Sequence, residues 1–125
     1  MLVNAIPQYI QNITNAKADL TGTGVVTLYT APSGAEFNAS VVNSILVSED
    51  SGNADTVTVT LTNGSDVFSL FKVAAVGANA TVELLTHNLV LQGTEILKVQ
   101  AATGNRLHVV ASIQEFAQSR NTTAL

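Results

Sequence analysis

The sequence of residues 55–73 is DTVTVTLTNGSDVFSLFKV, in which two alternating segments flank a short polar turn. Valine and leucine alternate with threonine up to Thr62, and alternate side chains of an extended chain lie on opposite faces. Asn63-Gly64 follows, a dipeptide that favours the tight turn of a β-hairpin. The alternation resumes after the turn, from Asp66 to Val73. The stretch therefore predicts two antiparallel strands joined by a short hairpin, with one face of the first strand buried.

The same succession of extended segments and turns continues through the middle of the chain. Turns rich in glycine and asparagine recur at a spacing close to that of a sandwich or small barrel. No room remains for crossover helices, so the sheets are expected to be antiparallel. We predict an all-β fold, an antiparallel β-sandwich of the Greek-key or jelly-roll type with about seven or eight strands. Further strands are expected at residues 25–30, 35–48, 81–84, 89–91, 95–101 and 106–116.

The composition fits one domain with a nearly neutral surface. The chain has 125 residues and no cysteine, which excludes disulfides and thiolate metal sites. Charged residues make up 11% of it, against roughly 25% in an average soluble domain. Low charge weakens the usual protection against self-association. The composition therefore indicates a subunit of an assembly.

Two classes of partner are not expected. The formal net charge is −4 with five lysines and arginines, which are scattered singly, whereas nucleic-acid binding needs a clustered basic surface. No apolar run approaches the ~18–20 residues of a membrane span. The first ten residues lack the basic and apolar regions of a signal peptide. We therefore predict neither nucleic-acid binding nor membrane insertion.

Three zones divide the chain: an N-terminal arm at residues 1–24, a β-sandwich domain at 25–117 and a polar C-terminal tail at 118–125. The arm carries apolar side chains among polar ones, and these are the candidate partner-binding residues. Two interpretations stay open for them. The arm docks on a partner or adds a strand to its sheet edge, or it folds back as an edge strand of its own domain. The candidates are Leu2, Val3, Ile6, Tyr9, Ile10 and Ile13.

Catalytic chemistry finds no support in the sequence, and the chain is not expected to be an enzyme. A serine nucleophile on a Gly-x-Ser-x-Gly elbow is missing. His87 is expected in a bend and His108 on the outer or partly exposed face of a late strand. Neither histidine has an acidic partner at the spacing of a metal site. Thr21-Gly22-Thr23-Gly24 lacks the lysine and helix of a phosphate loop and is interpreted as a flexible link.

An acidic turn leaves one alternative open. Glu49, Asp50 and Asp55 surround Ser51-Gly52-Asn53, and three acids in a turn can offer oxygens to Ca²⁺. The spacing does not match an EF-hand loop. A solvated acidic loop is the interpretation that we prefer, and no cofactor or metal is predicted.

Residues 25–116 also resemble a known family. The pattern has a strand ending in Tyr29-Thr30, a Pro-Gly turn and a long strand, then the alternating strand at 56–62. It continues with GANATVEL at 77–84, a Gly-x-x-Ile-x-Val strand at 93–99 and a last strand ending in ASIQE at 111–115. This order is similar to that of the small virion structural proteins of tailed phages, which are β-sandwich modules found on heads and in tails.

The resemblance implies a non-catalytic protein present in many copies on a virion. It implies a head decoration or cement protein on the capsid surface, bound to the major capsid protein or to other virion proteins. A homo-oligomer, trimer or dimer, would suit this role. A tail, collar or fibre component is one alternative. A carbohydrate-binding sandwich is the other, although sugar rings usually stack on Trp or Tyr and only Tyr9 and Tyr29 are present.

Overall fold

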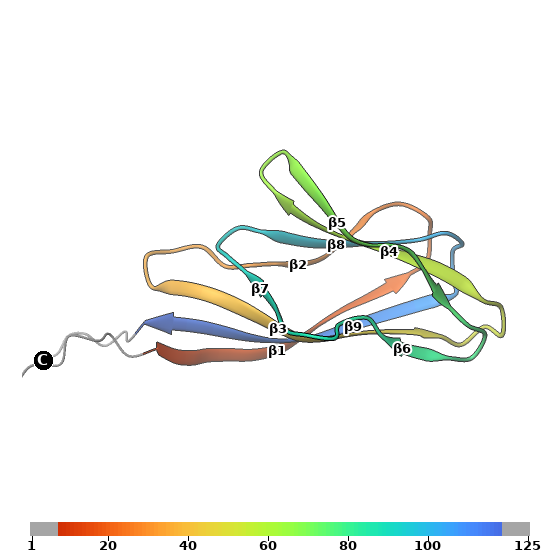
Figure 1. Ribbon diagram of the computed structural model, residues 1–125, viewed down its shortest axis with the longest axis horizontal. Coiled ribbons are helices and arrows are strands. Elements are labelled where there is room, and N and C mark those ends of the chain that lie inside the picture. Colours follow the sequence, from red (N-terminus) through yellow and green to blue (C-terminus); the bar gives the residue numbers. More distant parts are fainter. Residues whose placement is uncertain (1–7, 119–125) are drawn as a thin grey trace, which may run out of the picture.

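The computed structural model describes residues 8–118, and within this range every regular element is a strand. Two antiparallel sheets pack face to face as a sandwich (Figure 1), which confirms the predicted fold class. All eight segments expected from the period of two are strands. The nine strands are β1 (Gln8–Leu20), β2 (Val26–Thr30), β3 (Phe37–Glu49), β4 (Asp55–Asn63), β5 (Asp66–Val76), β6 (Thr81–Glu83), β7 (Leu89–Leu91), β8 (Ile96–Ala101) and β9 (Leu107–Gln118).

The strand order is that of a jelly roll. The five-stranded sheet runs β1-β9-β3-β6, and β7 also pairs with β3. β7 pairs with residues 40–42 of β3, and β6 pairs with residues 46–48. The four-stranded sheet runs β2-β8-β4-β5. If β6 and β7 count as one interrupted strand, eight strands form two facing sheets of four, the arrangement produced by two Greek keys.

The core lies between the two sheets and is aliphatic. Val57, Val59 and Leu61 of β4 point inward and alternate with threonines, as their sequence pattern predicts. Leu97 and Val99 of β8 line the same interior and are buried. Because both sheets contribute one apolar face each, the sandwich buries a core without cysteine.

The hairpin between β4 and β5 confirms the Asn63-Gly64 prediction. Asn63 pairs with Asp66, and Gly64 has a φ of 63°, a conformation that glycine adopts without steric cost. The tip of the hairpin rises away from the sandwich (Figure 1). The register of β5 shifts twice against β4, and Val73 has a φ of 54° beside one shift. These bulges bend β5, which is an edge strand of its sheet.

The N-terminal stretch corrects the predicted domain boundaries. Residues 8–20 are β1, which pairs with β9 from Gln8–Gln118 to Leu20–Leu107. Thr14, Ala16 and Ala18 are partly buried and Leu20 is fully buried, so this strand contributes a face to the core. Of the two interpretations of this stretch, the structure shows the second, in which residues 8–20 are an edge strand of the chain's own domain. The boundary predicted at residue 24 therefore falls inside the sandwich.

Candidate functional site

The outer face of the five-stranded sheet carries several exposed apolar side chains. Strand register places its residues in rows that run across the strands, because directly paired residues share a face. One row joins Ile10, Phe116 and Ala39. The next row joins Ile13, Gln114, Val41 and Val90 across four strands.

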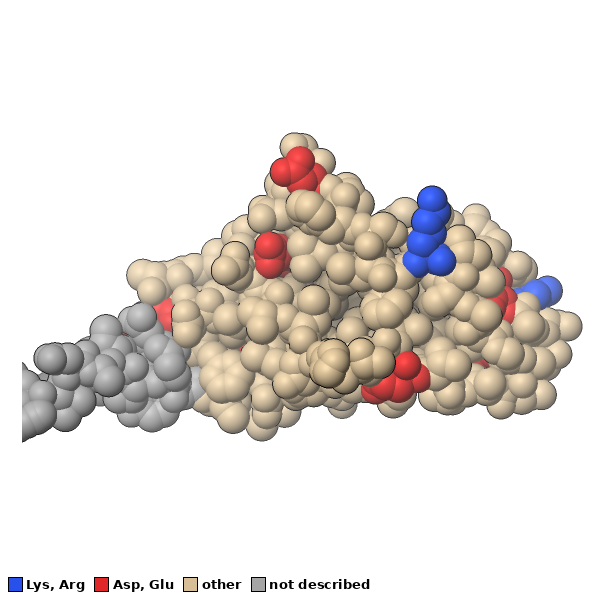
Figure 2. Space-filling model, viewed as in Figure 1, with Lys and Arg blue, Asp and Glu red and all other residues tan. Residues whose placement is uncertain are grey.

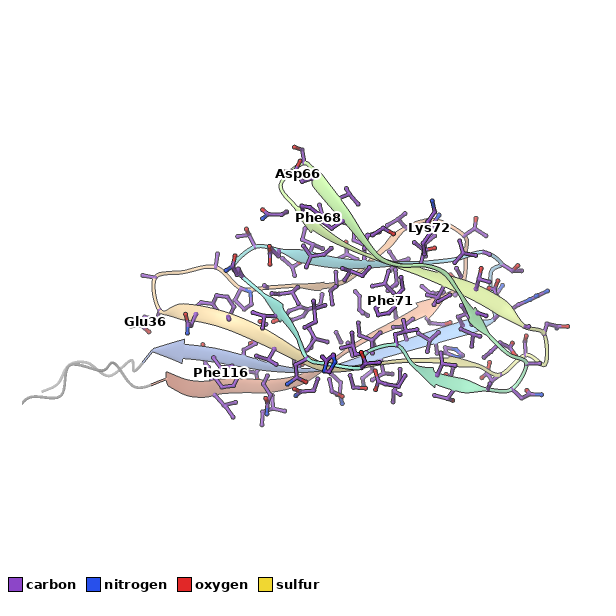
Figure 3. All side chains as sticks on the ribbon, viewed as in Figure 1. Glu36, Asp66, Phe68, Phe71, Lys72 and Phe116 are labelled. Carbon is purple, nitrogen blue, oxygen red and sulfur yellow. The ribbon has the colours of Figure 1, made fainter. Side chains whose placement is uncertain are left out.

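These two rows contain an apolar patch, defined here as Ile10, Ile13, Val41, Val90 and Phe116, with the polar Gln114 between Ile13 and Val41. Ile10 is 47% exposed, Ile13 is 70% exposed and Val90 is 53% exposed. Val41 and Phe116 are half-buried, and Phe116 lies at the end of the layer beside β1 (Figure 3). Large aliphatic side chains exposed together on a sheet face favour binding to another surface.

Charge lies at the other end of the same face. Further along, one row joins Lys17, Val110, Leu46 and Glu83, and the next joins Asp19, His108, Ser48 and Thr81. No residue of the two apolar rows is charged. In Figure 2 the lower surface of the molecule is correspondingly tan, with few charged groups. The face therefore changes from apolar to charged along the strands.

Behind the patch, a polar cluster joins the two sheets. The Tyr29 hydroxyl of β2 donates to Glu115 Oε2 of β9 at 2.5 Å and lies 2.7 Å from the Ser40 hydroxyl of β3. Burial and the neighbouring Glu115 raise the pKa of Tyr29. Asn12 Nδ2 of β1 donates to the other Glu115 oxygen at 3.3 Å. Four strands are thus cross-linked at the end of the sandwich that carries the apolar patch.

A pocket of about 620 Å³ opens beside this cluster. Gln11, at the single bulge of β1, lines it together with Phe37 and Glu115. Glu115 already accepts hydrogen bonds from Tyr29 and Asn12. Asn12, Ser33 and Glu36 also line the pocket, so its wall is largely polar.

The acidic turn differs from the solvated loop that the sequence predicts. Glu49 is 2% exposed, and its carboxylate accepts hydrogen bonds from Gly52 N at 3.1 Å and Asn79 N at 2.9 Å. It also accepts from the Ser51 amide and hydroxyl. Asp55 is buried as well and accepts from Thr103 N at 3.0 Å. Both carboxylates hold loops in place, because backbone N–H groups of these loops need acceptors.

Glu49 makes the stability of the fold sensitive to acid. Burial raises the pKa of this carboxyl, but the hydrogen bonds from Ser51, Asn79 and Gly52 outweigh it and lower the pKa from 4.5 to about 2. A lowered folded-state pKa stabilises the protein above pH 4.5, and this contribution is lost as the pH falls towards 2. We expect the melting temperature of the wild type to fall over this window.

Glu49→Gln tests this expectation through thermal melts at a series of pH values. The variant should be less stable than the wild type at neutral pH and should lose less stability between pH 4.5 and 2. Asp66→Asn is the control, because Asp66 is exposed at the projecting hairpin (Figure 3). Equal acid sensitivity in the Glu49 variant and the wild type would contradict this role of Glu49.

The two histidines lie apart. His87 is exposed in a bend between β6 and β7, and His108 is half-exposed on the outer face of β9, as predicted. His108 Nε2 lies 3.3 Å from Asp19 and Nδ1 lies 3.7 Å from Asp50. Residues 8–118 contain no group of three or more His, Asp or Glu side chains able to hold a metal. The same range contains no helix of the length and apolarity that a membrane span requires.

The structure brings together only part of the predicted partner-binding set. Ile10 and Ile13 lie in the apolar patch. Leu2, Val3 and Ile6 fall outside the described residues, as does the side chain of Tyr9. The sequence analysis did not select the other members of the patch, Val41, Val90 and Phe116. Alternation within each strand could have marked them as outward, but only the register shows that they adjoin Ile10 and Ile13.

No protein-family model and no curated protein sequence matches the chain, but solved structures share its fold. A chain of the acid-stable capsid of Helicobacter pylori bacteriophage KHP30 aligns with a TM-score of 0.56 at 13% identity. The alignment covers 93% of this chain and 99% of that one. A chain of infectious bursal disease virus, Gx strain, aligns with a TM-score of 0.51 at 13% identity. That alignment covers 90% of this chain and 33% of the viral one.

Both are chains of viruses. At this level of identity the likeness shows a common fold, a double-sheet β-sandwich. The KHP30 chain is matched over nearly its whole length, so the fold occurs there without a large additional domain. The chain of infectious bursal disease virus contains the fold in about a third of its length.

Proposed function

We propose that this chain is a structural protein of a virion, a decoration or cement protein that binds the major capsid shell of a tailed phage. The observation that carries the proposal is the apolar patch, an exposed and uncharged area on a rigid sheet. The fold that the chain shares with a chain of a phage capsid structure supports a location on the particle.

The patch suits attachment to a preformed surface. Burying an exposed valine or isoleucine stabilises a complex by about 1.5–3 kcal/mol. The two apolar rows contain no charge whose removal from water would oppose binding. Tyr29 and Glu115 hold β9 against β2 beneath the patch, so little ordering is needed when it binds. Leu2, Val3 and Ile6 precede the patch in the sequence and remain predicted contacts with the shell.

The structure gives less support to a carbohydrate-binding module. Sugar rings in such sites usually stack on an exposed Trp or Tyr. The chain has no Trp, and its exposed ring on β5 is Phe68, which is 53% exposed. Tyr29 instead directs its hydroxyl towards Ser40 and Glu115 between the sheets. Phe116 is half-buried among aliphatic neighbours in the patch.

Binding to capsid shells that lack the protein tests the proposal. We expect saturable binding and greater thermal resistance of the shells. Ile13→Asp and Val90→Asp should each weaken binding about tenfold or more, since each puts a charge into a buried apolar contact. Val67→Asp is the matched control, because Val67 is a valine exposed by 62% on the other sheet.

The outcomes separate the alternatives. Binding that is lost with Ile13→Asp and Val90→Asp but kept with Val67→Asp supports attachment through the patch. Binding that survives both patch variants would show that another surface meets the shell. Wild-type protein that ignores the shells overturns the decoration role, and the same variants would then be tested on tails.

A further inference from the structure

The four lateral edges of the sandwich are not equally protected against pairing with another strand. Unpaired backbone groups at a sheet edge attract a further strand, and proteins counter this with short strands, bulges and charges. β2 has five residues and a register shift, and β6 and β7 have three residues each. β5 is longer but carries two register shifts, the positive φ of Val73 and the exposed Lys72.

β1 has the least of this protection for its length. It has 13 residues, and its only register shift lies between Ile10 and Asn12. From Asn12 to Leu20 it is a regular strand that pairs with β9 on one side. No described strand of the chain pairs with its other side. Lys17 and Asp19 are the only charged residues of this strand.

We propose that β1 pairs antiparallel with β1 of a second copy of this chain, around a two-fold axis at Asn15. The two five-stranded sheets then join into one continuous sheet. A two-fold axis makes the contact self-complementary, so a single strand of each copy is sufficient to build it.

The side chains of β1 favour a second copy in this register. With Asn15 opposite Asn15 of the other copy, Ile13 lies opposite Lys17, whose methylene stem packs beside Ile13. Thr14 lies opposite Ala16, and both are small. A shift that centres the axis on Lys17 would place two like charges opposite each other and is disfavoured.

The pairing has a consequence for attachment, and this consequence rests on the proposed function. The two-fold axis is perpendicular to the joined sheet, so both apolar patches face the same side. One patch of two rows on four strands covers on the order of 300 Å², below the roughly 800 Å² per partner of a stable interface. When one patch of a dimer binds a flat shell, the second patch is held close to the same surface. The dimer therefore binds the shell more tightly than a single patch does.

Single-cysteine variants test the register, because the chain has no cysteine of its own. Paired residues in an antiparallel sheet have Cα atoms about 4.5–5.5 Å apart, within the range of a disulfide. Asn15→Cys should therefore form a disulfide dimer on mild oxidation. Ile13→Cys alone and Lys17→Cys alone should not, because identical positions then lie ~13 Å apart. An equal mixture of these two variants should cross-link.

Two further measurements complete the test in solution, without shells. Light scattering should give a dimer for the wild type. Asn15→Lys should raise the dissociation constant of the dimer about fivefold or more, since like charges then meet at the axis. Thr27→Lys changes an exposed residue of the β2 edge and should leave the dissociation constant unchanged. Ser69→Cys on β5 is the control for the cross-linking experiment and should form no disulfide dimer.

A wild type that stays monomeric at high concentration overturns the pairing. Cross-linking of Ile13→Cys alone as readily as of the mixture overturns the register. Attachment to the shell is tested separately by Val90→Asp, because Val90 lies on β7, at the edge of the sheet away from β1.

Discussion

Ile45→Ala is expected to lower the free energy of unfolding by about 2–5 kcal/mol. Ile45 is completely buried in β3 and pairs with the equally buried Ala111 of β9, the central contact of the five-stranded sheet. Because this interior is closely packed, removing the side chain loses apolar burial and leaves a cavity. The loss is a large fraction of the 5–15 kcal/mol that stabilises a typical domain.

Chemical denaturation of the wild type and the variant measures this loss. Leu46→Ala is the matched control, because Leu46 is the next residue of the same strand and is 40% exposed on the outer face. We expect it to cost no more than about 1 kcal/mol. Similar losses at Ile45 and Leu46 would show that the sheet does not bury the face assigned to it.

Tyr29→Phe is expected to cost about 1–3 kcal/mol. The change keeps the ring and removes only the hydroxyl, which leaves the buried Ser40 hydroxyl and one oxygen of Glu115 without this partner. Unsatisfied buried polar groups carry the full cost of their lost hydration. Asn12→Ala, which removes the longer and exposed hydrogen bond to Glu115, should cost less.

Alkaline pH gives a second measurement of the same hydroxyl. The pKa of Tyr29 is raised in the folded state, mainly by burial and by Glu115, so the unfolded chain loses this proton first, near pH 10.0. Stability contributed by the neutral phenol is therefore present below pH 10.0 and falls above it. Tyr29→Phe should remove this part of the alkaline loss. Identical alkaline profiles for the two proteins would argue against the buried phenol.

Most strands could be predicted because they depend on local pattern. The alternation at residues 55–62 and the Asn63-Gly64 turn predict β4, the hairpin and β5 from neighbouring residues alone. The N-terminal stretch was harder. Thr14, Ala16 and Ala18 form only a weakly apolar inner face, and the sequence left an arm and an edge strand equally open.

The candidate site could be predicted only in part. Ile10 and Ile13 were selected as apolar residues without a place in the predicted core. Val90 was missed because it lies more than 70 residues along the chain from Ile13, in a strand of only three residues. Glu49 looked like a solvated acid because one of its hydrogen-bond donors is Asn79, 30 residues away in the sequence.

Sequence pattern is sufficient to predict the fold class, eight of the nine strands and the hairpin. Such features follow from the geometry of an extended chain and from turn residues, which act over a few positions. Three features could be seen only in the folded chain: β9 lies between β1 and β3, the two rows of the outer face adjoin, and Tyr29 reaches Glu115. Those contacts arise when the two sheets bury their apolar faces together, so they depend on partners distant in the chain.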